Sequence, residues 1–272
     1  IAGTKFEHFE SSGWQMQPSL RSVWHPASAQ TLWGAVSSAV HTPSIGQLSV
    51  EINSWIDPNG APPVLGSLRG SQAVDPERAV ARELGYRWQP DARLALSASL
   101  SFTRYKNMIT TELGSPQLKT SPFFYVEVPV TVINSGSGTV RAFELEADAQ
   151  LTRAWRLRST YSYVLPRAPL ENSGLSDDPR HQFVVRSSIA IGARVDADLT
   201  LRHVSKLHLL GIDSYTGVDV RLAFKQIERF EIAIAGHDLL DAQHPEFADR
   251  LIDIPVTDVP RSLSLSAVWK PR

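Results

Sequence analysis

Residues 94–103 read Leu-Ala-Leu-Ser-Ala-Ser-Leu-Ser-Phe-Thr, and they alternate between two kinds of side chain. Successive side chains of a β-strand point to opposite faces, so Leu94, Leu96, Leu100 and Phe102 would share one face. Small and hydroxyl-bearing side chains would occupy the other face. The stretch therefore predicts a strand with one apolar side and one polar side.

The same alternation recurs along nearly the whole chain, with charge on the polar side. Residues 143–151 set Phe, Leu and Ala against Glu and Asp, and residues 218–225 set Val, Leu and Phe against Asp, Arg and Lys. The strand candidates fall near 3–10, 15–25, 30–42, 79–89, 93–112, 138–151, 154–166, 181–193, 196–206, 214–225, 229–240 and 259–269. A series of about a dozen such segments is typical of a transmembrane β-barrel. We therefore expect an all-β, antiparallel, up-and-down barrel.

The connections between these segments alternate in length, which is a second and independent pattern. Short connections at 25–29, 90–92, 152–153, 194–195 and 226–228 are interleaved with longer ones at 43–78, 113–137, 167–180, 207–213 and 241–258. Outer-membrane barrels have short periplasmic turns and long extracellular loops, whereas a sandwich with Greek-key crossings has no reason to sort its loops. Within one long connection, residues 123–134 alternate like a hairpin arm above the membrane, with residues 134–138 as its turn.

Composition excludes several other classes of protein. The formal net charge is −1, which gives no support to nucleic-acid binding, and the absence of cysteine excludes a disulfide scaffold. No apolar run approaches the roughly 18 residues that a membrane helix needs. No zincin helix motif, nucleophile elbow or phosphate loop occurs, and the eight histidines show no metal-ligand spacing. We expect no enzymatic activity, no cofactor and no metal site.

Aromatic residues lie mostly toward the ends of the expected strands, as the interfacial girdles of a barrel require. They are Trp24, Trp33, Tyr86, Trp88, Trp155, Tyr161, Tyr163 and Trp269.

Several stretches resemble the barrel of TonB-dependent outer-membrane receptors, and they occur in that family's order. The stretches are Trp-Gly-Ala-Val-Ser-Ser-Ala-Val-His-Thr-Pro-Ser at 33–44, Ala-Arg-Glu-Leu-Gly-Tyr-Arg-Trp-Gln-Pro at 81–90, Phe-Thr-Arg-Tyr-Lys-Asn-Met-Ile-Thr-Thr at 102–111, Asp-Leu-Leu-Asp at 238–241 and Val-Pro-Arg-Ser-Leu at 259–263. Asp238 stands where the family usually has Asn, and Trp269 is followed by Lys-Pro-Arg where the family usually ends on an aromatic residue.

The resemblance implies a barrel of about 22 strands around a plugged lumen. The strand candidates would be the last twelve of these, so we expect residues 1–272 to be one partial barrel domain. The plug domain and about ten N-terminal strands would be absent, as would a signal peptide before Ile1. An incomplete barrel predicts an open, curled sheet in this chain.

Charged residues on the polar faces are the candidates for contact with the plug. The turn at 152–153 makes two strands neighbours, so acidic and basic side chains should meet across the ladder. The family resemblance implies that these charges dock the plug; the alternative is that they only keep the lumen hydrated. The lumen-facing candidates are Glu144, Glu146, Asp148, Arg156, Arg158 and Arg87.

The resemblance also implies a function in the bacterial outer membrane. The intact receptor would bind a scarce nutrient, most often a ferric siderophore, and would import it with energy delivered by the TonB complex through the plug. Cobalamin, haem or a saccharide are other substrate classes in the family. The candidates for ligand contact in or beside the long loops are Trp55, Phe123, Phe124, Tyr125 and His181. The expected partners are therefore the lipid bilayer, a small nutrient or metal chelate and, indirectly, TonB.

Two alternative interpretations remain open from sequence. An even number of strands allows closure of a stand-alone small barrel that acts as a passive pore. A soluble β-rich binding module would instead pack its apolar faces against a second layer of structure.

Overall fold

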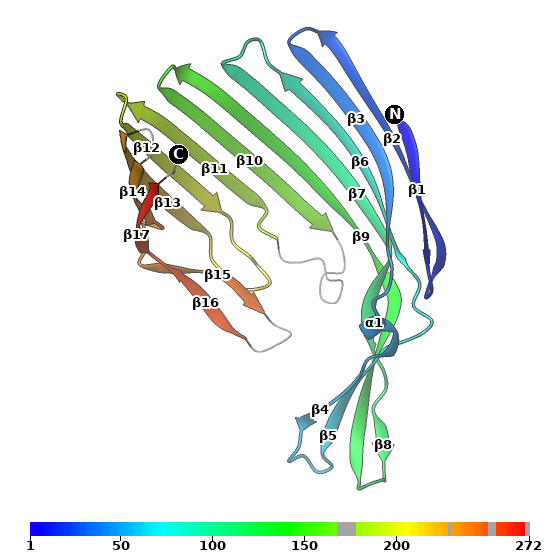
Figure 1. The fold of residues 1–272 in the computed structure, drawn as a ribbon. Coiled ribbons are helices and arrows are strands. Elements are labelled where there is room, and N and C mark those ends of the chain that lie inside the picture. Colours follow the sequence, from blue (N-terminus) through cyan, green and yellow to red (C-terminus); the bar gives the residue numbers. More distant parts are fainter. Residues whose placement is uncertain (168–177, 228–229, 250–253, 270–272) are drawn as a thin grey trace.

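The computed structural model describes residues 1–167, 178–227, 230–249 and 254–269, and it consists almost entirely of one antiparallel sheet (Figure 1). The main path of the sheet runs β1(Ala2–Phe9), β2(Gly13–Ala27), β3(Gln30–His41), β6(Glu77–Trp88), β7(Leu94–Leu113), β9(Tyr125–Thr152), β10(Trp155–Arg167), β11(His181–Ile191), β12(Val195–Val204), β13(Tyr215–Ile227), β14(Phe230–His237) and β17(Ser262–Trp269). Each strand of this path pairs with the next one along it, so the expected up-and-down topology is confirmed.

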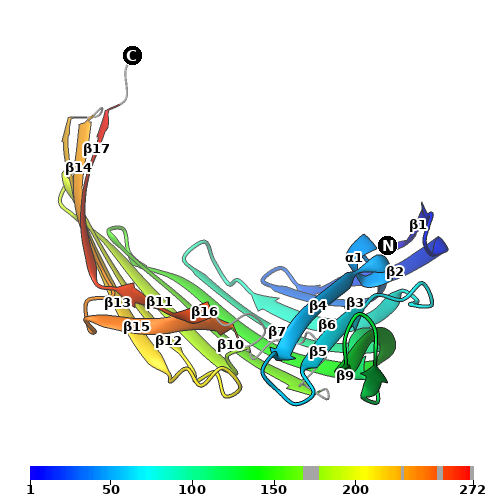
Figure 2. The ribbon, with the colours of Figure 1, turned by 90° about the horizontal axis from the view of Figure 1, so that it is seen from below.

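The sheet curls into an open trough whose two ends stand apart, as Figures 1 and 2 show. Within the described residues, β1 and β17 do not pair with each other, so the sheet has two edges. The expectation of an open sheet is therefore confirmed, and closure of these twelve strands as a small pore does not occur.

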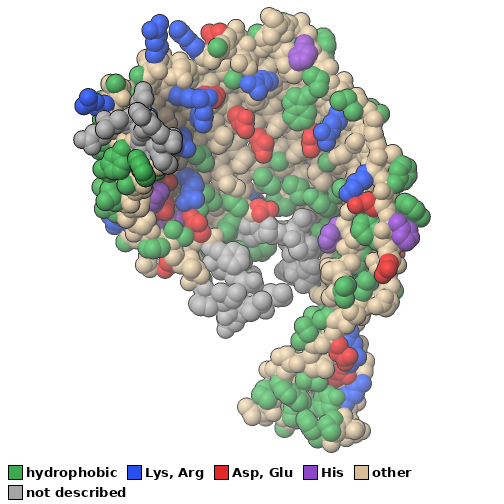
Figure 3. Space-filling model, in the orientation of Figure 1, with side chains coloured by type: hydrophobic (Ala, Val, Ile, Leu, Met, Phe, Trp, Pro, Cys, Tyr) green, Lys and Arg blue, Asp and Glu red, His purple; other side chains and the backbone are tan. Residues whose placement is uncertain are grey.

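The strand register places the two kinds of side chain on opposite faces. Leu96 pairs with Ala147 and Leu100 with Phe143, whereas Ser97 pairs with Glu146. Figure 3 looks onto the concave face, where acidic and basic side chains gather over the central strands. The apolar side chains of the same strands therefore form the convex face.

The convex face is covered by no second layer within the described part of the chain. Leu84 is 55% exposed and Leu100 is 53% exposed, although both lie in the middle of paired strands. A soluble module would bury such side chains, because each stabilises a folded core by about 1.5–3 kcal/mol. The exposed convex face suits a bilayer and argues against the soluble interpretation.

The two rims of the trough differ as the loop lengths predicted. Tight turns join β2 to β3, β6 to β7, β9 to β10 and β11 to β12 at one rim. The other rim carries the long connections, including α1(Ile45–Ser49), the hairpin of β4(Glu51–Asp57) and β5(Val64–Arg69), and β8(Gln117–Lys119). A second small sheet, β15(Gln243–Asp249) with β16(Ile254–Pro260), lies in the connection before β17. The expected loop 167–180 and the end 270–272 lie largely or wholly outside the described residues.

The expected turn at 134–138 is wrong. β9 is one strand of 28 residues that continues through Gly136 and pairs with β7 on both sides of it. The Gly-Ser-Gly sequence allows close approach instead, since a Cβ added at Gly136 would lie 2.7 Å from the Cβ of Met108. The irregularity falls on β7, where Asn107 adopts φ 55° at a register shift, a left-handed conformation that Asn tolerates.

The long β9 carries an arm beyond the long-loop rim. β5 pairs with β9 in parallel, β4 pairs with β5, and β8 pairs with the start of β9. We call this projection, formed by β4, β5, β8 and residues 125–131 of β9, the β-arm; it extends below the trough in Figure 1.

Candidate functional site

The inner wall between β9 and β10 carries an ion cluster centred on one carboxylate. Arg156 donates to Asp148 through Nε at 2.8 Å and through Nη2 to the second oxygen, and the Nε of Arg158 lies 3.4 Å from that second oxygen. The predicted meeting of opposite charges across this ladder is confirmed for Asp148. It is wrong for Glu144 and Glu146, which contact no arginine among the described residues.

Glu144 and Glu146 instead line a depression of the inner wall with Arg87 and Trp33. Arg87 and Glu146 flank Ser97 from opposite sides, and the guanidinium of Arg87 donates to Gln89 at 2.9 Å. This depression thus brings together three of the six predicted lumenal residues, and the charged groups of all three are exposed.

Trp33 lies in this inner depression. Its position among the aromatic residues near strand ends had predicted an interfacial girdle, and this prediction is wrong for Trp33. It pairs with Gly85, and a Cβ added at Gly85 would lie 2.1 Å from the indole ring. The indole ring of Trp33 therefore lies directly over Gly85 of β6, where any side chain would displace the ring. Residues Leu84 and Tyr86 on either side of this glycine belong to the opposite, convex face.

Ion pairs continue along the inner wall toward the C-terminal strands. Asp198 of β12 lies 3.4 Å from Arg221 of β13 and 3.7 Å from Arg186 of β11. Arg221 also contacts Glu231, and Lys225 contacts Asp196. Charges of both signs therefore neutralise one another on this part of the wall, which favours a hydrated lining over a site for one charged ligand.

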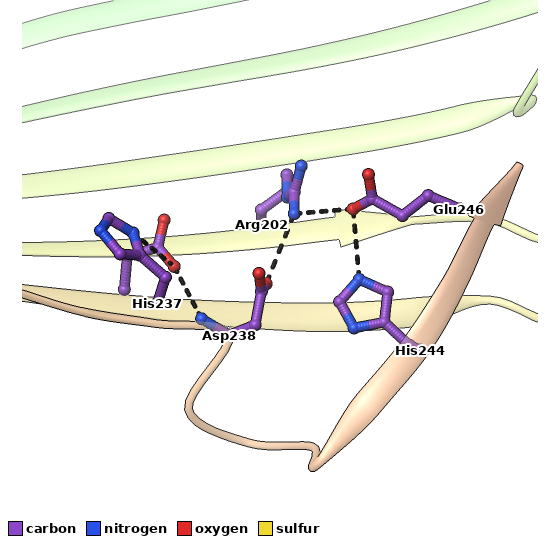
Figure 4. Close-up of polar contacts among 6 residues, drawn as sticks. Arg202, His237, Asp238, His244 and Glu246 are labelled. Atoms are coloured by element: carbon purple, nitrogen blue, oxygen red, sulfur yellow. Dashed lines mark hydrogen bonds and ion pairs between the residues drawn. The ribbon is translucent and has the colours of Figure 1, made fainter. Parts of the chain in front are cut away.

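A second polar cluster fastens the β15–β16 hairpin to the inner wall (Figure 4). The Nη2 of Arg202 on β12 donates to Glu246 at 3.0 Å and lies 3.4 Å from Asp238, which follows β14. His244 is 5% exposed, and its Nε2 lies 3.2 Å from the same Glu246 oxygen. Tyr215 stacks on the His244 ring with centroids 4.2 Å apart. These contacts hold a long-loop element against the wall.

Asp238 fits this cluster because of its backbone. Its φ is 52°, a left-handed conformation in which Asn and Asp are several-fold enriched over other residues. Its N–H donates to the Asp219 carboxylate at 3.0 Å. Its own carboxylate lies so close to Gly217 that a Cβ added at Gly217 would be 2.7 Å from the Asp238 Oδ1. Asp at this position, where the resembling family motif led us to expect Asn, is compatible with the turn and supplies a charge that meets Arg202.

The β-arm is organised around one buried carboxylate. Glu127 is 6% exposed and accepts from the Nη2 of Arg69 at 2.8 Å, while the Nζ of Lys119 lies 3.2 Å away. The hydrogen bond from Arg69 holds the pKa of the Glu127 carboxyl below its usual range, although burial opposes this. The charges thus tie β5 and β8 to β9 outside the barrel wall.

The tip of the β-arm carries three of the predicted ligand-loop aromatics in contact. Trp55 stacks on Phe123 with centroids 5.7 Å apart, and Tyr125 lies 6.0 Å from Trp55 and 5.6 Å from Phe123. Phe124 is 53% exposed beside them. Figure 3 shows a dense hydrophobic patch at the end of this arm.

His181 lies away from the arm, at the start of β11. Its Nδ1 lies 2.9 Å from the Tyr161 hydroxyl, and its ring lies 4.9 Å from that of Tyr163. These residues share the convex face, so His181 belongs to an aromatic group at the wall surface and does not join the other ligand candidates.

A family model described as "TonB dependent receptor-like, beta-barrel" matches residues 1–238. The chain belongs to the TonB-dependent receptor family. An "Iron-regulated outer membrane virulence protein" of Vibrio cholerae is 21% identical over 254 residues, which cover 89% of this chain and 38% of that protein. This family and this relative locate the protein in the bacterial outer membrane, and the family is one of receptors and transporters, not an enzyme family.

Solved structures of TonB-dependent receptors share the fold. The siderophore receptor PirA from Acinetobacter baumannii superposes with a TM-score of 0.75 at 16% identity, over 98% of this chain and 43% of that one. A ferric enterobactin receptor mutant, PfeA from Pseudomonas aeruginosa, in complex with enterobactin gives 0.77 at 15% identity, over 98% and 42%. The chain thus spans about two fifths of the length of these relatives.

Family membership also orients the trough. The short turns are periplasmic, and the long loops with the β-arm are extracellular. The β15–β16 hairpin, which contains Glu246, was not predicted from the sequence, because the residues of that connection show no sustained alternation. Arg202 lies on the inward face of β12, but no local pattern in the sequence indicates its contact with Glu246, 44 residues away.

Proposed function

We propose that the full-length protein imports a ferric siderophore across the outer membrane. The observation that carries this proposal is the combination of a charge-lined inner wall with an aromatic β-arm on the extracellular rim. One structural neighbour described as a siderophore receptor, another described as a ferric enterobactin receptor and one iron-regulated relative support the substrate class.

The inner depression is the proposed contact for the plug domain. Asp148, Arg156 and Arg158 satisfy one another, so they have little to offer a partner. Glu144, Glu146 and Arg87 present exposed charges around Trp33 and are free of ion pairs within the described residues. A plug surface with complementary charges would dock there, and TonB would act on that plug.

The β-arm is the proposed first contact for the ligand. Exposed aromatic faces bind flat, apolar or aromatic groups, and such residues often dominate binding energy. Trp55, Phe123, Phe124 and Tyr125 provide this surface outside the lumen. An aromatic iron chelate would suit this surface, because aromatic rings stack on one another.

The two edge strands of the sheet indicate that further strands belong to the same barrel. β1 and β17 present unpaired backbone, which lipid does not tolerate. We propose that residues 1–272 form one part of a larger barrel domain, whose further strands pair with these two edges.

The test is uptake of radioactive iron by cells that lack the gene and by cells complemented with the full gene product. Chelates of catecholate and hydroxamate type, haem and cobalamin serve as a panel. The proposal expects complementation to restore uptake of at least one ferric siderophore, and only when TonB is functional. Uptake confined to haem or cobalamin, or uptake independent of TonB, would contradict it.

A further inference from the structure

The convex face carries a row of arginines that the uptake function does not use. Arg82 of β6, Arg104 of β7 and Arg141 of β9 lie on the face that otherwise holds Leu84, Leu100 and Phe143, and all three arginines are exposed. Arg167 of β10 continues the row, since it pairs with Thr139 beside Arg141. This wall faces lipid, where a cation is normally costly.

The register sets the spacing of the row. Arg82 and Arg141 both pair with Phe102, and Arg104 lies two residues beyond Phe102 on the same strand. Arg104 is therefore a diagonal neighbour of both, and diagonal positions lie about 7–8 Å apart. Three like charges thus stand within the span of one phosphorylated headgroup.

These cations differ from those of the inner wall. The inward-facing basic residues of β10 to β13 each contact a carboxylate: they are Arg156, Arg158, Arg186, Arg202, Arg221 and Lys225. In the part of the chain that is described, no carboxylate pairs with Arg82, Arg104 or Arg141. The ring of Phe102 instead lies 5.9 Å from the guanidinium of Arg82 and 5.8 Å from that of Arg141. Cation–π contact orients both groups, and their N–H groups have no hydrogen-bond acceptor among the described residues.

The row lies at one end of the apolar band. On β7 the outward residues from Leu94 to Leu100 are apolar, and the cations begin at the level of Phe102. Eight residues at about 3.3 Å each, tilted by about 40°, span roughly 20 Å of membrane. That height approaches the apolar band of about 25 Å, so the row stands at the extracellular headgroup level.

We propose that Arg82, Arg104 and Arg141 bind the phosphate groups of a phosphorylated glycolipid in the extracellular leaflet. Arginine forms bidentate, charge-assisted hydrogen bonds with phosphate, and a headgroup supplies the counter-charge that the wall lacks. Bound lipid acyl chains would lie along the apolar residues of β6, β7 and β9 below the row.

The experiment measures lipid binding by the full gene product, purified in detergent, by native mass spectrometry. The probes are lipid A, which carries two phosphates, the same lipid without phosphates, and inorganic phosphate as a competitor. The test variant is Arg82→Gln/Arg104→Gln/Arg141→Gln. The matched control is Arg93→Gln/Arg153→Gln/Arg194→Gln, which removes three exposed charges at the periplasmic turns.

The expected result is loss of lipid A affinity by about tenfold or more in the test variant and little change in the control. The wild type should prefer lipid A to the phosphate-free lipid, and inorganic phosphate should compete poorly. Equal binding of both lipids, or unchanged binding by the test variant, would overturn the proposal, and strong competition by phosphate would assign the row to free anions. Where the triple variant fails to fold, Arg104→Gln alone must still weaken lipid A binding. The result is independent of which nutrient is imported.

Discussion

The packing of Trp33 on Gly85 gives a prediction that can be worked out from the structure. The substitution Gly85→Ala adds a Cβ that would lie 2.1 Å from the indole, far inside van der Waals contact. Either Trp33 leaves its place or β6 shifts away from β3. Overpacking of this kind destabilises a protein by about 1–3 kcal/mol, which reduces the folding equilibrium constant by about 5- to 150-fold.

Gly34 provides the matched control for this substitution. It lies on β3 next to Trp33, and its added Cβ would meet the Glu83 carbonyl oxygen at an ordinary 3.6 Å. Gly34→Ala should therefore be neutral, or should stabilise by about 0.4–1 kcal/mol through the unfolded chain. The double variant Trp33→Ala/Gly85→Ala removes the obstructing ring, so most of the Gly85→Ala penalty should disappear in that background.

The assay is urea unfolding of the full gene product in lipid vesicles, followed by the gel mobility of folded and unfolded barrel. Equal stability of the Gly85→Ala and Gly34→Ala variants would refute the reasoning. An undiminished Gly85→Ala penalty in the Trp33→Ala background would refute it as well, since the clash would then not involve the indole.

Three further predictions concern the loops. Arg202→Gln should loosen the β15–β16 hairpin by about 1 kcal/mol, because the Arg202 side chain is 39% exposed, and limited proteolysis within 243–249 should speed up about fivefold. The pKa of the Glu127 carboxyl is lowered in the folded state, so Glu127 should stabilise the β-arm above its unfolded-state pKa of about 4.3, and this stabilisation should be lost as the pH falls through the folded-state pKa. Hydrogen exchange of the β5 and β8 amides should show this loss as faster exchange at acid pH. In the Glu127→Gln variant these amides should exchange faster already at neutral pH, and the acid transition should disappear. Trp55→Ala should weaken siderophore binding about tenfold, whereas Trp14→Ala, outside the arm, should not; equal effects in a fluorescence titration would contradict the role of the arm.

The faces of the sheet could be read from the sequence because strand periodicity is local. The pattern at 94–103 already separates Leu100 from Ser99, and the tight turn at 152–153 makes contact between Asp148 and Arg156 foreseeable. The twelve expected segments correspond to the twelve strands of the main path. The sequence did not specify the register in which these strands pair, and the structure supplies it.

Other features depend on contacts that no local pattern reveals. Gly136 reads as part of a turn, yet β7 extends far enough to pair beyond it, so β9 continues as a strand. The parallel pairing of β5 with β9 joins residues about sixty positions apart. The inward place of Trp33 depends on the glycine opposite it, which becomes visible only when the register of β3 and β6 is known.

The most direct test of the account is the accessibility of single cysteines on alternate residues of β7. The chain contains no cysteine, so Leu96→Cys, Ser97→Cys, Ser99→Cys and Leu100→Cys can be made on a clean background, with any cysteine elsewhere in the full gene product replaced. Spin labels on the protein in lipid vesicles are then exposed to oxygen, which concentrates in lipid, and to a water-soluble nickel complex. The account predicts that the nickel complex relaxes labels at 97 and 99 and that oxygen relaxes labels at 96 and 100. The same response at all four positions, or the opposite alternation, would contradict a lumen on the polar face and lipid on the apolar face.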